Sequence, residues 1–201
     1  MKKILNFFKG KPQESALPSK PPKVALVSYS VCGKSWLAQR LAKGYCGSNR
    51  ATIHFDLFNA NWNGFQIQLL DTERNFLPTF ARQYIKDVDL ILICYGVSEF
   101  SSDIINSKYL NKINENWLDT PRALVLLQAD LKTPEQLRDL SLQLQNVEER
   151  FPFQFHAICS ARTGDGIDGL KAKIKNALEL EEQLTLNTEI ELQPTQFQGQ
   201  F

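Results

Sequence analysis

The stretch VALVSYSVCGKSWLAQRLAKGY, residues 24–45, decides the fold. Its opening, VALVSYS, is apolar and rich in valine, which is typical of a buried strand. Its closing part, KSWLAQRLAKGY, places Leu37, Leu41 and Tyr45 near one face of a helix. The tripeptide GKS (33–35) lies directly between the two and matches the second half of the phosphate-binding pattern G-x-x-x-x-G-K-[ST]. The stretch therefore predicts a strand, a phosphate-binding loop and a helix in direct succession.

Each part of this loop has a chemical reason to hold phosphate. Backbone N–H groups and the start of the helix present positive potential to phosphate oxygens. The Lys34 ammonium reaches the outer phosphates, and the Ser35 hydroxyl binds magnesium. Ser28 occupies the position of the first glycine of the pattern. Because that glycine serves the backbone geometry of the loop, we expect Ser28 to weaken the fit without removing a ligand-binding side chain.

The remainder of the chain alternates strand and helix patterns. HFDLFNANWNGFQIQLLD contains two strand patterns around Asn63-Gly64, a strong hairpin signal, and the second strand ends on Asp71. Apolar strand patterns follow in DVDLILICYGV, RALVLLQAD and FQFHAICSA. A helical pattern follows each of these three strands. The first covers 101–117, the second begins with an N-cap and first turn at Thr133-Pro134, and the third covers 167–182.

This alternation predicts an α/β fold, a three-layer domain with a mainly parallel six-stranded sheet, one antiparallel strand and helices on both faces. Ligands of such sheets bind at the carboxyl ends of the strands, where every motif singled out here falls. A length of 201 residues suits one domain with tails. We assign the domain to 23–184, between a flexible basic N-terminal segment (1–22) and a flexible glutamine-rich C-terminal tail (185–201).

Composition and charge argue against several classes of function. The net charge of +1 gives no support to general nucleic-acid binding, and no apolar run is long enough to cross a bilayer. The four cysteines lie far apart without metal-ligand spacing. We expect them to be reduced thiols, which is consistent with a cytoplasmic protein.

The two ends of the chain carry opposite charge. Six lysines and one acid precede residue 24, whereas five glutamates and no basic residue follow from residue 179. We interpret the basic segment as a solvated tail. A weak contact with a membrane or a partner through Ile4, Leu5, Phe7 and Phe8 is the main alternative, and a secretory signal is a minor one.

The order of the motifs resembles the Ras-like small GTPases, most nearly Rab or Ras, over residues 23–182. GKS is followed by a threonine in a loop, a hairpin ending LLDT, and then LICYGVSEFSS, LLQADL and CSAR. The resemblance implies a P-loop G domain that binds GTP or GDP with Mg²⁺. The nucleotide contacts that it implies are Ser30, Val31, Cys32, Gly33, Lys34, Ser35, Asp130, Ser160, Ala161 and Arg162.

The same resemblance implies a magnesium site at Ser35, Thr52 and Asp71. In that family a threonine of the first switch completes the metal coordination when the γ-phosphate is present. Thr52, 17 residues after Ser35, is the best match. Asp71 would hold the ion through water. An ordinary threonine at a strand edge is the alternative interpretation of Thr52.

LLQADL aligns with the guanine-reading N-K-x-D motif of the family. Leu127 replaces the asparagine, Gln128 replaces the lysine, and Asp130 is retained. In the family this aspartate accepts the N1 and N2 hydrogens of guanine, which is the stronger part of base selection. Gln128 can lay its aliphatic part over the base, and the backbone at Ala161 would face the guanine oxygen. A helix-cap or turn role is the alternative for Asp130.

Two departures predict slow or absent GTP hydrolysis, and we assign no catalytic residue. LLDTERNF resembles the D-T-A-G-Q-E stretch of the family without its glycine and its water-orienting glutamine. Glu73 and Asn75 are the candidates to replace that glutamine, and a carboxylate beside a developing negative phosphate disfavours Glu73. Ser30 occupies a position that is commonly glycine, where a side chain crowds the γ-phosphate and an incoming arginine finger.

The resemblance also implies a protein effector or complex as the partner. The switch segments near Thr52 and over 71–80, and the hairpin 55–70, would contact it. We expect Trp62 and Phe65 to pack against the domain, and if exposed they would form a partner-binding patch. The chain ends QFQGQF without a cysteine, so we expect no prenyl anchor. The likeness to Rab proteins implies trafficking or host-membrane signalling.

Three functions remain open from the sequence. The first, which we favour, is a guanine-nucleotide-binding regulatory protein. The second is a pseudo-GTPase scaffold or subunit without nucleotide, favoured by Ser28, Leu127, Gln128 and the missing glutamine. The third is a P-loop kinase for a small metabolite, which would need an arginine-rich lid that the sequence does not contain.

Overall fold

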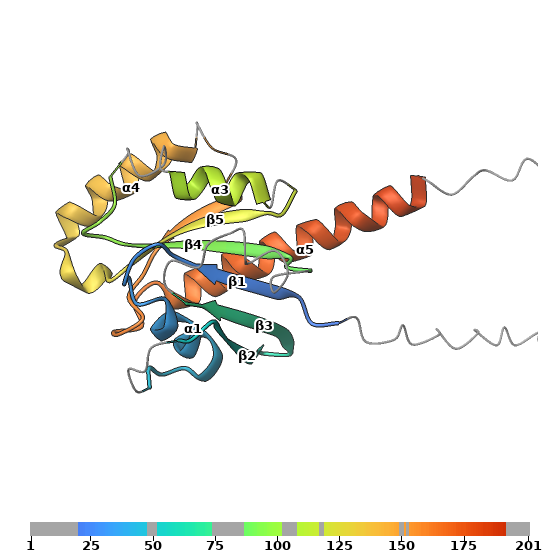
Figure 1. Cartoon of the computed structure of the whole chain (residues 1–201), viewed down its shortest axis with the longest axis horizontal. Helices are drawn as coiled ribbons and strands as arrows, with labels where there is room; N and C mark the ends of the chain where they lie inside the picture. Colours follow the sequence, from blue (N-terminus) through green and yellow to red (C-terminus); the bar gives the residue numbers. More distant parts are fainter. Residues whose placement is uncertain are drawn as a thin grey trace, which may run out of the picture.

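A computed structural model describes residues 20–47, 52–73, 87–101, 108–116, 119–148, 151 and 153–191 (Figure 1). Strands and helices alternate along it as the sequence predicts. In chain order they are β1 (Lys23–Val27), α1 (Lys34–Lys43), β2 (Phe55–Trp62), β3 (Phe65–Thr72), β4 (Leu90–Gly96), α3 (Lys108–Asn116), β5 (Arg122–Leu127), α4 (Pro134–Glu148), β6 (Phe155–Ile158) and α5 (Ile167–Glu191). A short 3₁₀ turn, Ala129–Leu131, follows β5.

The strands form one six-stranded sheet in the order β2-β3-β1-β4-β5-β6. Only β2 and β3 pair antiparallel, and the other neighbours are parallel. The predicted fold class is therefore confirmed. Since β1 lies between β3 and β4, Leu26 of β1 is paired with Asp71 of β3 and with Leu92 of β4. This register brings the end of β3 beside the start of the phosphate-binding loop.

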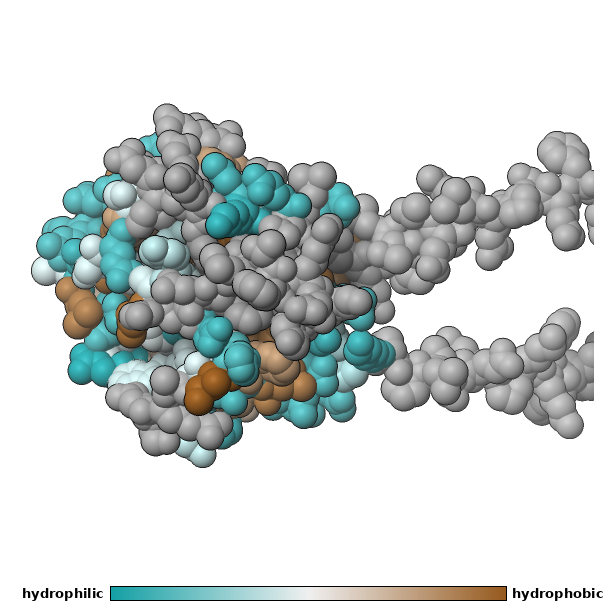
Figure 2. Space-filling model, in the orientation of Figure 1, coloured by the Kyte–Doolittle hydropathy of each residue, from teal (hydrophilic) through white to brown (hydrophobic). Residues whose placement is uncertain are grey.

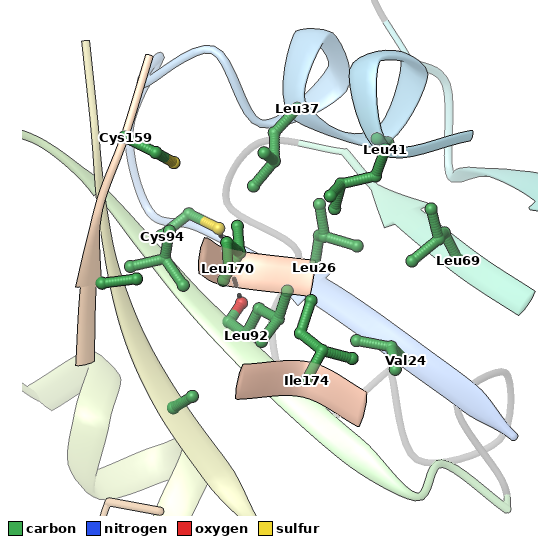
Figure 3. Packing of buried hydrophobic residues seen from close by; sticks show 14 of the residues in the cluster. Val24, Leu26, Leu37, Leu41, Leu69, Leu92, Cys94, Cys159, Leu170 and Ile174 are labelled. Atoms are coloured by element: carbon green, nitrogen blue, oxygen red, sulfur yellow. Dashed lines mark hydrogen bonds between the residues drawn. The ribbon is translucent and has the colours of Figure 1, made fainter. Parts of the chain in front are cut away.

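The two faces of the sheet bury separate hydrophobic clusters. Successive strand residues point to opposite faces, so Leu26 and Leu92 lie under α1 and α5, whereas Ala25 and Ile93 lie under α3 and α4. Figure 3 shows Leu37 and Leu41 of α1 together with Leu170 and Ile174 of α5 around the strand residues of the first cluster. Figure 1 shows α1 on one side of the sheet and α3 and α4 on the other.

The predicted hairpin and helix cap are both present. Asn63 and Gly64 have φ angles of 53° and 94°, as a type I′ turn requires, and they join the paired residues Trp62 and Phe65. At the start of α4 the Gln136 N–H donates to the Thr133 hydroxyl at 3.3 Å, and the Thr133 N–H donates to the Gln136 side-chain oxygen at 3.0 Å. This reciprocal pair is a capping box.

Two element boundaries differ from the prediction. β1 ends at Val27 rather than Ser30, because Ser28 bonds the loop that follows instead of a neighbouring strand. α5 continues to Glu191, beyond the predicted end at residue 182. Five of the nine added residues are leucine, glutamate or glutamine, which favour helix, none is glycine or proline, and the next proline is Pro194.

Several predictions concern residues outside those that the structure describes. They are the N-terminal segment up to residue 19, the switch residues 74–80 with Asn75, both ends of the 101–117 helix, and the tail from residue 192. The division of the chain into a domain and two flexible ends stays a prediction. None of the helices within the described ranges has the length and apolar character needed to cross a membrane.

Candidate functional site

The phosphate-binding loop joins β1 to α1. Gly33 caps the N-terminus of α1 with φ 89° and ψ 21°, a left-handed conformation that favours glycine. A Cβ at this position would meet no atom within 4 Å, so the requirement for glycine is conformational rather than steric. The Leu37 N–H donates to the Gly33 carbonyl at 3.0 Å and closes the first helical turn.

Ser28 is fully buried, and its hydroxyl organises the loop. It donates to the Ser30 carbonyl at 2.9 Å and accepts from the Ser30 N–H at 3.1 Å. The Cys32 thiol donates to it at 3.2 Å, and burial raises the pKa of that thiol, which keeps its proton available. Ser28 is not among the residues with positive φ, so its backbone does not require glycine. The serine therefore supplies side-chain hydrogen bonds where the pattern has a glycine.

The three predicted magnesium ligands come together at the base of the loop. The hydroxyl oxygens of Ser35 and Thr52 are 3.1 Å apart, and the Thr52 hydroxyl donates to Asp71 Oδ2 at 2.8 Å. They come from the start of α1, the loop before β2 and the end of β3. Hydroxyl and carboxylate oxygens suit Mg²⁺, so the donor set fits this ion.

Lys34 and Asp71 form a buried ion pair in the same cluster. Lys34 Nζ lies 3.0 Å from Asp71 Oδ1, and 7% and 0% of the two side chains are exposed. The ammonium also donates to the Thr72 carbonyl. The carboxylate thus accepts from Lys34 on one oxygen and from Thr52 on the other, and its charge is balanced inside the protein.

Asp130 lies in the 3₁₀ turn after β5, beside the loop that follows β6. The Ser160 hydroxyl donates to Asp130 Oδ1 at 2.5 Å, and Arg162 Nη2 lies 2.7 Å from Oδ2. The Ser160 hydrogen bond, together with the Arg162 guanidinium, holds the pKa of the Asp130 carboxyl below its ordinary value. Asp130 is therefore an anion that is ready to accept hydrogen bonds at neutral pH.

A cavity of about 800 Å³ runs between these two groups. All ten predicted nucleotide-binding residues line it, and Thr52 does as well. Its volume is in the range of small-molecule sites. Four further lining residues were not predicted as site residues, namely Trp36, Gln39, Thr72 and Leu131. Thr72 and Leu131 end the LLDT and LLQADL motifs, whereas Trp36 and Gln39 belong to no motif and reach the cavity through their place on α1.

Comparison with known families supports the same assignment. A family model described as "Ras family" matches residues 23–179, which is most of the chain. The chain belongs to the Ras family. It is thus a small GTPase domain of the P-loop type, and proteins of this family generally bind guanine nucleotides with Mg²⁺. A search of curated proteins found no match.

In this Ras-family domain Arg40 of α1 anchors the loop after β6. Its Nε donates to the Ala161 carbonyl and its Nη2 to the Arg162 carbonyl, each at 2.7 Å. The Cys46 thiol donates to the same Ala161 carbonyl at 2.8 Å. These contacts hold the CSAR element against α1 beside the cavity. No motif marks Arg40 in the sequence, because its partners in this loop lie more than 100 residues away.

Gln128, in the lysine position of the family's base motif, has a left-handed backbone with φ 66°. Its side chain lies close to β4, because a Cβ added to Gly96 would meet Gln128 Oε1 at 2.9 Å. Glycine at position 96 therefore leaves the space that Gln128 fills. The Gln128 side chain, just before the 3₁₀ turn, thus lies next to the end of β4.

Carboxylates occupy two places beside the phosphate end. The His54 N–H donates to Glu73 Oε2 at 3.1 Å, and the Glu73 N–H donates to the His54 carbonyl at 2.9 Å, so Glu73 ties β3 to the start of β2. The Ser30 hydroxyl donates to Glu99 Oε2, which follows β4. Each carboxylate is thus bonded within the chain through one of its oxygens.

The aromatic residues of the hairpin pack against the domain. Trp62 Nε1 donates to the Leu41 carbonyl at 2.8 Å, and the rings of Trp62 and Phe65 stack with centroids 6.3 Å apart. Lys175 lies 5.6 Å from the centre of the Phe65 ring. Both aromatics are partly buried against the first core cluster, so the packing interpretation holds rather than the exposed patch.

Exposed apolar side chains occur instead near the start of β2, which is an edge strand. Ile53, Phe55 and Leu57 are 76%, 40% and 50% exposed. Figure 2 shows that hydrophobic residues on the face drawn form small, separate patches among hydrophilic ones.

Proposed function

We propose that this chain is a guanine-nucleotide-binding regulatory protein, Rab-like or Ras-like, that hydrolyses GTP slowly or not at all and acts on a protein partner. The observation that carries the proposal is one cavity with two chemically different ends. Lys34, Ser35 and Thr52 provide a cation and hydroxyls at one end, and the Asp130 carboxylate lies at the other. A nucleotide needs both, because its phosphates are anionic and the guanine edge carries hydrogen-bond donors.

At the phosphate end of the cavity, nucleotide binding would replace contacts that the chain's own residues make with one another. Lys34 is paired with Asp71 and lies at the cavity wall, so its ammonium can turn from the carboxylate to phosphate oxygens. The hydroxyls of Ser35 and Thr52 and the Asp71 carboxylate would hold Mg²⁺, which supplies positive charge against the phosphates when bound. Because Thr52 precedes β2, its engagement would order the segment that leads into the exposed edge strand.

The residues around the phosphate end support slow hydrolysis. The Glu73 carboxylate is held by the His54 backbone, and a carboxylate is the wrong charge to stabilise an anionic transition state. The Ser30 side chain lies in the loop and is bonded to Glu99, which adds bulk and negative charge where a clear approach to the γ-phosphate is needed.

The partner surface that we propose is the edge of β2 with its hairpin. Ile53, Phe55 and Leu57 provide exposed apolar area on an edge strand next to Thr52, so contact there can depend on the nucleotide state. A cytoplasmic location and a role in trafficking belong to the same proposal, on the likeness to Rab proteins.

The first test is to denature the purified protein and chromatograph the released small molecules against GDP, GTP, ADP and ATP. Labelled GDP and GTP are then titrated with and without Mg²⁺. We expect bound guanine nucleotide, or binding at micromolar affinity or tighter that depends on Mg²⁺. Lys34→Ala should abolish that binding, and Lys171→Ala, which removes a half-buried lysine of α5 that does not line the cavity, should leave it unchanged.

A pseudo-GTPase is the second candidate, because the polar groups of the site are already satisfied by one another. Lys34, Asp71, Thr52 and Asp130 each have partners from the chain itself. A protein that is purified empty and takes up neither GDP nor GTP would establish this second function and refute the first.

A further inference from the structure

Both carboxylate oxygens of Asp130 are engaged by the chain itself. Ser160 donates to Oδ1 at 2.5 Å, and Arg162 Nη2 lies 2.7 Å from Oδ2. The Asp130 side chain is 11% exposed, whereas that of Arg162 is 63% exposed. The arginine therefore reaches from the surface to a carboxylate that lies inside the cavity.

The backbone that carries Arg162 is held in place independently of this ion pair. Arg40 donates to the carbonyls of Ala161 and Arg162, and the Thr163 N–H donates to the Ser160 hydroxyl at 3.2 Å. The same Ser160 hydroxyl donates to Asp130. The Arg162 side chain thus starts from an anchored position next to its partner.

Guanine offers two donors on one edge, the ring N1–H and the exocyclic amino group at C2, and a bidentate contact uses both oxygens of a carboxylate. Oδ1 retains a lone pair beside the bond from Ser160, because each carboxylate oxygen accepts two hydrogen bonds. At Oδ2 the Arg162 guanidinium takes up one of the two acceptor positions with a charged donor at 2.7 Å. A second donor of guanine in a bidentate contact would therefore have to share this oxygen with the arginine.

Resting on the proposed guanine-nucleotide binding, we propose that Arg162 competes with the exocyclic amino group of guanine for Asp130 Oδ2. It thereby lowers the preference of this chain for guanine over purines without that group. Hypoxanthine is such a purine, since it keeps the N1–H and lacks the amino group. An ion pair with an exposed partner contributes little stability, so its removal should strengthen GDP binding by about 1.4- to 5-fold.

The experiment measures the affinities of GDP and of inosine diphosphate with Mg²⁺ for the unmodified protein, Arg162→Ala and Arg162→Gln. The glutamine variant keeps much of the side-chain length without the charge. The control is Arg138→Ala, which removes an exposed arginine of α4 and the same unit of charge. We expect GDP to bind more tightly to both Arg162 variants, with inosine diphosphate little changed, so that the ratio of the two affinities rises.

The outcomes distinguish a failure of the competition by Arg162 from a failure of the proposed guanine-nucleotide binding. Unchanged or weaker GDP binding in both Arg162 variants would overturn the competition and leave nucleotide binding in place. An equal rise for GDP and inosine diphosphate, or the same change in Arg138→Ala, would overturn it too. GDP binding by the Arg162 variants alone would support it, and would mean that the arginine closes the site in the natural chain. No binding of GDP by any of these proteins would refute the proposed function and the competition with it.

Discussion

Lys34 is predicted to stabilise the fold as well as to bind phosphate. Its ammonium is 3.0 Å from Asp71 Oδ1, and the two side chains are 7% and 0% exposed. The substitution Lys34→Met keeps most of the aliphatic length and removes the charge, which leaves the Asp71 carboxylate buried with the Thr52 hydroxyl as its remaining side-chain partner among the described contacts. Removing one member of a buried ion pair costs about 3–5 kcal/mol.

That loss is a large fraction of the total stability of a domain, which is about 5–15 kcal/mol. Urea unfolding, followed by circular dichroism without added nucleotide, measures it as a lower midpoint. The matched control is Lys171→Met. Lys171 Nζ lies 3.5 Å from Asp168 Oδ1, and the two side chains are 27% and 99% exposed. This exposed pair should contribute about 0.2–0.5 kcal/mol.

A double-mutant cycle separates the ion pair from other effects of the substitution. Asp71→Asn removes the charge on the other side, and the double variant Lys34→Met with Asp71→Asn leaves neither charge buried. We expect the double variant to lose less than the sum of the two single losses, by about 1–3 kcal/mol. A Lys34→Met variant within about 1 kcal/mol of the unmodified protein, or strictly additive losses, would refute the reasoning.

Three further predictions concern single positions. Ser28→Gly should lower stability by about 1–2 kcal/mol, because the hydroxyl's bonds within the loop are lost and no positive φ is relieved; a urea midpoint above that of the unmodified protein would contradict this. Gly64→Ala should cost about 1–2 kcal/mol by the same assay, since φ is 94° there, and no loss would mean that the turn relaxes. Burial raises the pKa of the Cys159 thiol to about 12 from an ordinary value of 9.0. Above pH 9 the unfolded chain therefore loses a proton that the folded chain keeps, and stability should fall with rising pH by up to about 1.4 kcal/mol per unit. Urea midpoints at a series of pH values should show a shallower fall for Cys159→Ala, and equal slopes would exclude this thiol as a cause.

Local signals explain most of what the sequence predicts correctly. The hairpin turn is set by Asn63 and Gly64, which tolerate positive φ, and the start of α4 by the reciprocal bonds of Thr133 and Gln136. Each of these signals acts between residues that are adjacent or three apart, so it can be read without knowing the sheet order. The end of α5 was less well predicted, because leucine and glutamate are compatible with a helix and with a tail.

The sequence by itself determined the strand and helix order and the class of the sheet, because periodicity is local. It also predicted most of the residues that line the cavity, because the GKS, LLQADL and CSAR motifs are local. Only the tertiary structure decided how the members are paired. Lys34 and Asp71 are 37 residues apart, and Ser160 and Asp130 are 30 apart. These pairs meet because β1 lies between β3 and β4, and because β6 lies beside β5. Charge pairing and donor competition depend on distances between atoms that the fold alone brings together.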